Sequence, residues 1–255
     1  MWVIPNIEAF SLDVPMPGGT GKIPDVPAWS VREYGARVGV WRIMDVLQRH
    51  SVRGTVALNA DVCDAYPEVL RAALDLRWEL MGHGITNTQR LYEPGAQNVV
   101  AETMERIERA TGQRPLGWLS PGLQETWTTL DELAAARAEY VADWVIDDQP
   151  MLMRAGSWEL IALPYSSDIN DKIAFELMHY TPDDFDVVMR RQFDVLYEEG
   201  ARSGRVMAIA LHPYLIGYPY RIRALDSALG YIESHDKVWF ATGHEIAEAF
   251  RQSIA

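Results

Sequence analysis

One histidine in the sequence follows directly after an apolar run. Residues 206–211 are all apolar, and His212 comes next, before Pro213, whose missing N–H ends the hydrogen bonding of a strand. The imidazole of histidine has a pKa near about 6.5, so it can give or take a proton at neutral pH. His212 is therefore a candidate acid–base residue, and the alternative is a structural histidine at the edge of a sheet.

A second histidine has the same placement after a short apolar run. His83 follows residues 78–81, and Gly82 and Gly84 on either side of it permit close approach of a ligand or of backbone. Asn87 lies four residues further on, on the same face if the segment is helical. Two histidines at this spacing could bind one metal ion together, but the amide of Asn87 is a weak zinc ligand. The alternative is a turn histidine with ordinary hydrogen bonds.

Carboxylates occupy the ends of two further predicted strands. Asn6 and Glu8 are two residues apart, so their side chains lie on the same face of a strand, and Glu8 could be a base or a single metal ligand. Asp143 could orient a catalytic histidine, as supporting carboxylates do in other sites. The alternative for each carboxylate is a solvated acidic side chain, since the chain carries a formal charge of −13.

Aromatic residues and one arginine follow His212. Residues 217–221 read Gly-Tyr-Pro-Tyr-Arg, and Arg221 with its aromatic neighbours could clamp a planar or carboxylate-bearing substrate. The alternative is that Arg221 is a surface residue at the start of a helix. The sequence has no dinucleotide-binding glycine motif, no phosphate-binding Gly-Lys-Ser/Thr loop and no serine-hydrolase elbow.

These side chains can act together only if secondary structure brings them to one place. Short apolar strands alternate with longer amphipathic helices, which is typical of parallel βα units in an α/β fold. Strands are expected at residues 1–4, 52–58, 78–81, 116–119, 140–145, 160–164, 206–211 and 238–241, and helices at 34–50, 61–76, 98–110, 129–137, 183–200, 222–234 and 245–253. About seven such units favour a distorted (β/α)7-type barrel over the alternative, an open doubly wound sheet. In such a barrel the residues that follow the strands meet at one end.

Composition limits the class of protein. The chain has 255 residues, of which 48% are hydrophobic and 23% charged, and this fits one catalytic domain over residues 1–255. Residues 10–30 are rich in proline and glycine and predict an irregular excursion. The single cysteine, Cys63, excludes an internal disulfide and a four-cysteine zinc module.

Charge and hydropathy limit the partners. A formal charge of −13 disfavours nucleic acid and anionic membranes as partners. The first residues lack the basic and apolar regions of a signal peptide, and residues 206–211 are too short an apolar run to span a bilayer. We therefore expect a cytoplasmic protein with a small-molecule substrate.

The positions described above, in this order, resemble the motifs of the polysaccharide deacetylase superfamily. Residues 211–213, Leu-His-Pro, look like its last catalytic motif, whose histidine protonates the departing amine. Residues 78–84 look like its second motif, which carries two metal-binding histidines four apart. Residues 118–122, Trp-Leu-Ser-Pro-Gly, look like the third motif, which is Arg-Ser-Pro-Gly in many members, and residues 140–144 are similar to its Asp-Trp motif. The resemblance covers most of the chain and implies a distorted barrel of the polysaccharide deacetylase kind.

The sequence departs from the metal-dependent members of that family in three motifs. The first motif, which supplies an aspartate base and an aspartate ligand in the family, reads Asn6-Ile7-Glu8 here. Asn87 replaces the second metal histidine, and Leu119 replaces the arginine of the third motif. The metal ligands implied by the resemblance are thus reduced to Glu8 and His83, with Asn87 a poor third. We expect either no required cofactor or a weakly held, zinc-like divalent metal.

One branch of the superfamily matches these departures. Asn-x-Glu, a single histidine in the second motif, and His-Pro followed by residues 217–221 are similar to the branch that contains allantoinases and cyclic imide hydrolases. Those enzymes open small cyclic amides rather than deacetylating sugars. Barrels of this kind commonly assemble, so a homo-oligomer, dimer or tetramer, is expected.

Residues and resemblance together predict an amidohydrolase acting on a small linear or cyclic amide, imide or ureide. Water attacks the carbonyl with Glu8 as base or as metal ligand, His83 holds the metal or the carbonyl oxygen, and His212 protonates the leaving nitrogen. Asp143 would orient one of the histidines. The residues expected to bind the substrate are Asn6, Asn87, Trp118, Ser120, Tyr214 and Arg221.

Two other functions stay open from the sequence. The first is a metal-dependent deacetylase of an N-acetylated sugar or polysaccharide. The second is a binding protein on a catalytically decayed enzyme fold, because a fold alone does not determine a function.

Overall fold

The first strand of the chain lies between the second strand and the last one. The computed structural model describes residues 1–93, 95–96 and 98–254. Strand β1 (Trp2–Ile7) pairs in parallel with β2 (Thr55–Leu58) on one side and with β8 (Ala208–Leu211) on the other. Every residue of these three strands is buried, as expected for a parallel sheet covered on both faces.

The sheet has eight strands in the order β6-β7-β5-β4-β3-β2-β1-β8. All neighbours are parallel except β6 and β7, which form an antiparallel pair at one edge. The remaining strands are β3 (Glu79–Gly82), β4 (Gly117–Trp118), β5 (Tyr140–Val141), β6 (Met151–Ala155) and β7 (Trp158–Ala162).

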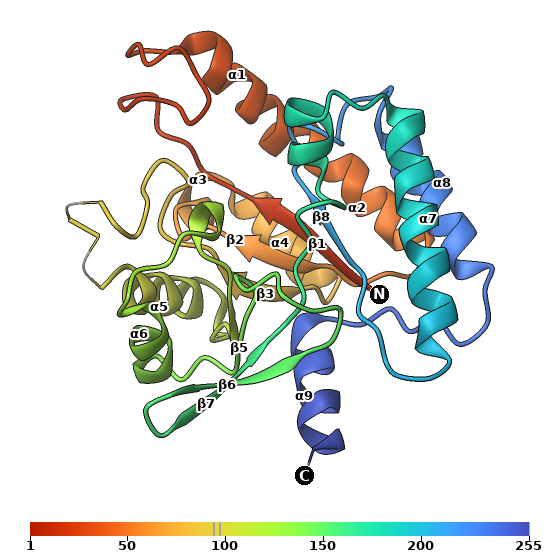
Figure 1. Cartoon of the computed structure of the whole chain (residues 1–255). Helices are drawn as coiled ribbons and strands as arrows, with labels where there is room; N and C mark the ends of the chain where they lie inside the picture. The colour runs from red at the N-terminus through yellow and green to blue at the C-terminus, as the bar shows by residue number, and fades with distance from the viewer. Residues whose placement is uncertain (94, 97, 255) are drawn as a thin grey trace.

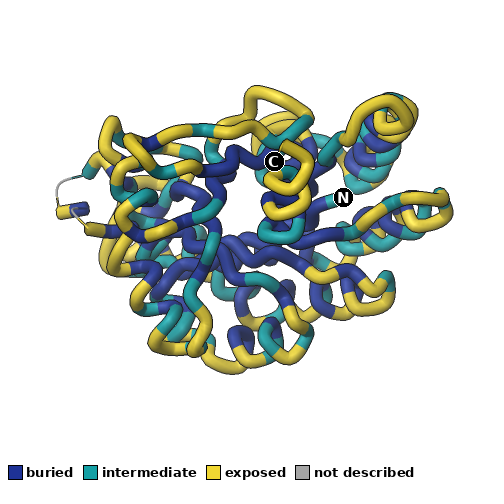
Figure 2. Tube along the Cα trace, turned by 90° about the horizontal axis from the view of Figure 1, so that it is seen from below, coloured by how far each residue is buried: buried dark blue, intermediate teal, exposed yellow. Residues whose placement is uncertain are grey.

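The sheet is curled, so that segments from its two edges meet. The Val206 N–H, just before β8, donates to the Asp148 carbonyl near the start of β6 (2.8 Å), and Asn170 forms an isolated parallel bridge with Ala210 of β8. Figure 2 shows the buried segments gathered toward the middle of the molecule and the exposed ones at its periphery. The predicted distorted barrel is confirmed.

Helices cover the outside of the curled sheet (Figure 1). They are α1 (Val26–Tyr34), α2 (Val40–Arg49), α3 (Val62–Ala65), α4 (Pro67–Asp75), α5 (Val99–Thr111), α6 (Thr129–Ala135), α7 (Pro182–Gly200), α8 (Ile222–Glu233) and α9 (Gly243–Ser253). Short 3-10 and π-helical turns occupy Pro121–Leu123, Gly35–Gly39 and Ile173–Leu177. Within the described residues, no helix combines the length and the apolar composition that a bilayer crossing needs.

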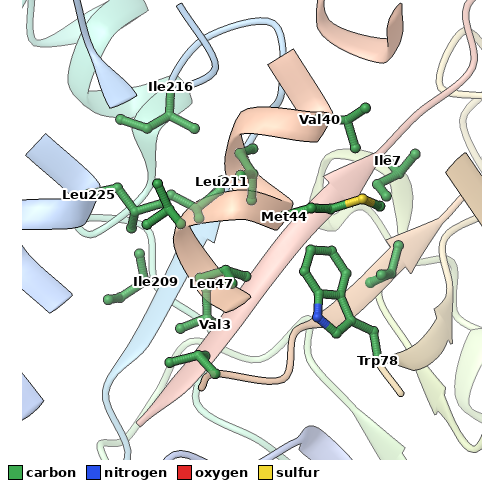
Figure 3. Packing of buried hydrophobic residues seen from close by; sticks show 14 of the residues in the cluster. Val3, Ile7, Val40, Met44, Leu47, Trp78, Ile209, Leu211, Ile216 and Leu225 are labelled. Carbon is green, nitrogen blue, oxygen red and sulfur yellow. The ribbon is translucent and has the colours of Figure 1, made fainter. Parts of the chain in front are cut away.

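The largest part of the core lies between α2 and the strands β1 and β8. Helix α2 turns its apolar side chains toward these strands, and Figure 3 shows Met44 and Leu47 beside Val3 and Ile7 of β1. Leu211, the last residue of β8, is fully buried in the same cluster. Burial of this kind stabilises by about 1.5–3 kcal/mol for each large aliphatic side chain. Packing against α2 therefore holds β1 and β8, the two strands that end closest to His212, in place.

Several predicted boundaries were wrong. The irregular segment predicted for residues 10–30 ends at Asp25, whose carboxylate accepts the Ala28 N–H and caps α1. Pro67 splits the helix predicted for residues 61–76 into α3 and α4, because proline removes a helical donor. Strand β6 was not predicted, and residues 238–241 form no strand although the Ala241 N–H donates to the Met1 carbonyl.

Candidate active site

The three side chains expected from strand ends come from neighbouring parts of the sheet. Glu8, His83 and His212 follow β1, β3 and β8, and the order β3-β2-β1-β8 places these strand ends along one edge of the barrel. Their exposed fractions are only 9%, 3% and 5%. Buried charged or titratable groups need partners, so their contacts decide what each can do.

Glu8 and His83 lie side by side. Oε1 of Glu8 is 3.5 Å from Nε2 of His83, an ion-pair distance longer than a typical hydrogen bond. The Asn59 side chain joins the two strand ends, because its amide donates to the His83 carbonyl and its oxygen accepts the Ala9 N–H (3.0 Å). Asn59 thus fixes the separation of the two functional groups.

The ring of His83 has a defined orientation. Its Nδ1 is 2.7 Å from the carbonyl oxygen of Leu119. A carbonyl can only accept, so Nδ1 carries a hydrogen and Nε2 is the atom that faces Glu8. His83 is therefore placed to interact with a reacting group beside Glu8.

Glu8 is ionised at neutral pH. Burial would raise its pKa, but the close approach of His83 and the positive charges of His212 and Lys172 outweigh it, so the pKa lies below its ordinary value of 4.5. Its second oxygen, Oε2, is buried and has no hydrogen-bond partner among the described residues. A buried carboxylate with a free oxygen can accept a proton or bind a ligand.

His212 is held by a carboxylate that the sequence analysis did not assign. Asp171 Oδ1 lies 2.6 Å from His212 Nδ1, and Asp171 Oδ2 accepts the backbone N–H groups of His212 (2.7 Å) and Ile216 (3.2 Å). Burial alone would lower the pKa of His212, but the negative charge of Asp171 outweighs it and the pKa is raised above 6.5. Asp171 therefore stabilises the imidazolium form, whose Nε2 can donate a proton.

The expectation that Asp143 orients a histidine was wrong. Asp143 Oδ1 accepts the Ser120 N–H at 2.7 Å, whereas the Nδ1 atoms of both histidines have other partners. Burial, together with the neighbouring Glu125, raises the pKa of Asp143 well above its ordinary value. Asp143 supports the loop after β4 and does not contact either ring.

Tyr214 packs directly against the histidine that precedes it by two residues. The Tyr214 and His212 rings are 5.6 Å apart in an edge-to-face arrangement, and Phe10 contacts Tyr214 in the same way at 6.0 Å. Tyr214 is itself 4% exposed. It forms one wall beside His212, and its contact with substrate stays a prediction.

A π-helical turn supports the segment that carries His212. A Cβ added at Gly39 would lie 2.1 Å from the Pro213 carbonyl oxygen, and one at Gly35 would lie 2.4 Å from the Tyr214 nitrogen. Only glycine permits this approach of two backbones. Arg42 completes the contact by donating to the Gly217 carbonyl at 2.7 Å.

Two residues expected to bind substrate have no exposed surface. Trp118 is fully buried in a cluster with residues of α5 and α6, and its Nε1–H donates to Ser120 Oγ at 2.9 Å. Ser120 has no exposed surface, and its N–H is held by Asp143. Both therefore support the loop after β4 rather than line the site.

Three other residues expected to bind substrate have mixed outcomes. The Asn6 amide donates to the Ile4 and Leu211 carbonyls, so it joins β1 to β8. Arg221 lies over the Phe175 ring at 4.4 Å, within an aromatic cluster, and donates weakly to the Leu215 carbonyl. Asn87 lies beside the catalytic strand ends, since its N–H donates to the Ala9 carbonyl next to Glu8 (2.9 Å).

The donor set offers a divalent metal only two good ligands. Two ligand atoms about 2.1 Å from a tetrahedral zinc ion are separated by about 3.4 Å, which matches the 3.5 Å between Glu8 and His83. Across the described part of the chain, however, no group of three or more His, Cys, Asp or Glu side chains could hold a metal ion. Asn87 offers only an amide. The site does not fit a tightly held zinc ion.

The comparisons with known proteins agree with this geometry. Residues 30–141 match the family described as "Polysaccharide deacetylase". A Schizosaccharomyces pombe protein, named as a candidate polysaccharide deacetylase, is 29% identical over 239 residues, covering 86% of this chain and 74% of that protein. A peptidoglycan deacetylase of Helicobacter pylori is 20% identical over 251 residues, covering 85% of each chain.

Two solved structures are similar over nearly the whole chain. A protein of Pseudomonas aeruginosa PAO1, described as a candidate polysaccharide deacetylase, has a TM-score of 0.88 and 29% identity, covering 98% of this chain and 90% of that one. The Puue allantoinase has a TM-score of 0.88 and 26% identity, covering 99% of this chain and 90% of that one. With its curled sheet and its strand-end residues, the chain is similar to the polysaccharide deacetylases, whose family model matches residues 30–141.

Proposed function

We propose that the protein hydrolyses the C–N bond of a small linear or cyclic amide, imide or ureide. One observation carries this proposal: an ionised carboxylate, Glu8, and an imidazole with a raised pKa, His212, occupy neighbouring strand ends. A base and an acid whose pKa values are shifted apart are what amide hydrolysis needs at neutral pH.

The first step is attack of water on the amide carbonyl. Glu8 accepts a proton from the water as its oxygen bonds to the carbonyl carbon. The oxygen of the former carbonyl then bears negative charge. His83 Nε2 lies beside Glu8 and, when protonated, can donate a hydrogen bond to this oxyanion. A donor aimed at a developing oxyanion contributes about 3–4 kcal/mol to transition-state stabilisation.

The second step breaks the C–N bond. The electron pair of that bond goes to the nitrogen, which takes a proton from His212 Nε2. Asp171 binds Nδ1 of the same ring, so it stabilises the imidazolium before transfer and holds the ring in one orientation. The products are a carboxylic acid and an amine, which remain one molecule when the substrate is cyclic.

The similarity to the allantoinase structure supports a small cyclic amide, because it extends over 99% of this chain at 26% identity. The names of the two curated relatives favour a second candidate, deacetylation of an N-acetylated sugar or peptidoglycan. The ligand set argues against the metal-dependent form of that reaction, because it lacks a third His, Cys, Asp or Glu among the described residues.

NMR identification of products separates these candidates. The protein is incubated with cyclic imides, allantoin, dihydropyrimidines and N-acetylated sugars, and Glu8→Gln serves as the inactive control. A ring-opened acid formed by the wild type and not by the variant is the expected result. Free acetate from the sugars would replace the proposal with the deacetylase function. Absence of any product, with ligand-induced thermal shifts retained, would indicate a binding protein.

A further inference from the structure

Two cationic side chains flank the tyrosine that packs on His212. Lys172 Nζ is 3.4 Å from the Tyr214 hydroxyl and 5.8 Å from the centre of its ring. The guanidinium of Arg32 lies over the same ring at 5.3 Å and over Phe10 at 5.0 Å. The two cations come from segments far apart in the sequence and meet beside the proposed acid.

These cations lie near the catalytic groups. Lys172 directly follows Asp171, which binds His212, and its positive charge lowers the pKa of both Glu8 and His212. Arg32 belongs to α1, and Figure 1 shows α1 and the loop before it at the end of the molecule toward which β1 points. Both cations therefore lie at the same end of the barrel as the site.

The proposed hydrolysis does not use either cation. Water activation, oxyanion binding and nitrogen protonation are assigned to Glu8, His83 and His212. The carboxylates of Glu8, Asp171 and Glu176 also act on this tyrosine. Glu8 is the proposed base and Asp171 is bound to His212, so the two cations and Glu176 are the charged groups here that the hydrolysis leaves without a role. A substrate with no charge would gain little from the two cations.

Lys172 is free to exchange its partner. Its ammonium group contacts the Glu176 carboxylate at 2.8 Å, but these two side chains are 39% and 42% exposed. An ion pair this exposed contributes little to stability, so an incoming anion can replace Glu176. The ammonium group carries three donors, and the tyrosine hydroxyl accepts only weakly from it at 3.4 Å.

Arg32 has a different role from Lys172. Its two terminal nitrogens donate to the Ala28 and Pro17 carbonyls (2.8 and 2.7 Å), so they hold α1 to the loop before it. Its Nε is buried and, among the described residues, has no hydrogen-bond partner. Arg32 thus contributes a fixed positive charge, while Lys172 supplies the mobile donors.

We propose that Lys172, supported by the charge of Arg32, binds an anionic group of the substrate, so that the preferred substrate is an amide or ureide that also carries a carboxylate. This inference rests on the proposed hydrolysis and narrows its substrate class. Lys172 is then a specificity-determining residue. Lysine suits this role because its ammonium group is a compact charge with three rotatable donors, so it can bind an anion from several directions.

A matched pair of substrates tests the specificity. Succinamate and succinamide have the same carbon skeleton, but succinamate carries a carboxylate where succinamide carries a second amide. The wild type is expected to prefer succinamate by at least about tenfold in kcat/KM, because a charge-assisted hydrogen bond is lost with the diamide. Lys172→Met should bring the ratio of kcat/KM for succinamate to that for succinamide close to one, mainly by raising the KM for succinamate. Lys172→Arg should retain part of the preference for succinamate.

A control variant removes the same charge elsewhere. Lys237 lies between α8 and α9, two residues before Trp239, whose carbonyl accepts a hydrogen bond from the Met1 amino group at the start of the chain (2.8 Å). Lys237→Met should therefore keep the wild-type preference. If Lys172→Met and Lys237→Met change the ratio equally, or if the wild type shows no preference while hydrolysing both amides, the anion site is wrong.

Binding of succinate by calorimetry needs no turnover and separates the two proposals. Succinate is expected to bind the wild type at least about tenfold more tightly than Lys172→Met, and added salt should weaken the binding. If succinate binds in this way but neither amide is hydrolysed, the anion site stands and hydrolysis of these amides is overturned. Equal affinity of wild type and Lys172→Met overturns the anion site.

Discussion

Asp171 binds His212 at two points, with Oδ1 2.6 Å from the ring Nδ1 and Oδ2 2.7 Å from the backbone nitrogen. The two contacts fix the ring and the chain that carries it. Asp171 has no exposed surface, so its charge acts on the imidazole with little screening by water. This pairing makes His212 a proton donor with one defined direction of transfer.

The pH dependence of the reaction follows from this pair. His212 must be protonated to act as the acid, and its raised pKa keeps it protonated above pH 6.5, so kcat falls only as pH rises through that pKa. Asp171→Asn removes the charge that raises the pKa. The alkaline fall in kcat should then move to lower pH, and the rate at pH 8 should drop by at least about tenfold. A pH–rate profile in which the alkaline limb does not move would contradict this role.

Glu8 controls the acid side of the same profile. The pKa of Glu8 lies below 4.5, so the carboxylate stays ionised as pH falls until that pKa is reached. Activity of the wild type should therefore persist to about pH 5, provided the fold is intact. Glu8→Gln keeps the shape but cannot accept a proton, and kcat should fall by about 10²–10⁴ at every pH. Circular dichroism provides the check on folding, and turnover near wild-type levels would exclude Glu8 as the base.

The sequence predicts the strand-end residues well because their signal is local. A short apolar run that ends in a glycine or a proline places the next polar residue at the end of a parallel strand, and this identified His83 and His212. Glu8 was found by the alternation of side chains along β1. The structure brings all three to one edge of the barrel.

Asp171 follows the strand predicted for residues 160–164, but it was given no role because nothing near it in the sequence links it to a histidine. It lies in the helical turn that leads into the π-helical turn Ile173–Leu177, and its partner His212 is far along the chain. Trp118 was misplaced for a related reason. Strand β4 has only two residues, so alternation cannot tell which face its side chains occupy, and Trp118 packs outward against the helices.

Metal removal tests the interpretation of the ligand set. Dialysis against a chelator should leave the turnover of the wild type within about twofold, because Glu8 and His83 alone hold zinc weakly. Asn87→His adds an imidazole beside Glu8 and should increase zinc affinity at least about tenfold, as measured by competition with a chromophoric chelator. Gln113→His, on an exposed residue, is the control and should leave the affinity unchanged. Loss of wild-type turnover on chelation, restored by zinc, would contradict the account.

The contact between the π-helical turn and the His212 segment can be tested by overpacking. Gly39→Ala places a methyl group 2.1 Å from the Pro213 carbonyl oxygen, so the two backbones must separate. We expect a loss of about 1–3 kcal/mol in the free energy of unfolding, measured with denaturant, together with a lower kcat. Gly230→Ala in α8 is the matched control, because its nearest atom is 3.7 Å away, and it should gain up to about 1 kcal/mol from helix propensity. Equal free energies of unfolding for the two variants would contradict a close contact between Gly39 and the Pro213 backbone.

The measurement that tests the central claim most directly compares two leaving groups in His212→Ala. The pair consists of an amide that the wild type hydrolyses and the 4-nitrophenyl ester of the same acid, whose leaving group needs no proton. If His212 protonates the departing nitrogen, the variant should lose about 10²–10⁴ in kcat on the amide but less than about tenfold on the ester. Equal losses on both substrates, or near-normal turnover of the amide, would contradict the assignment of His212 as the general acid.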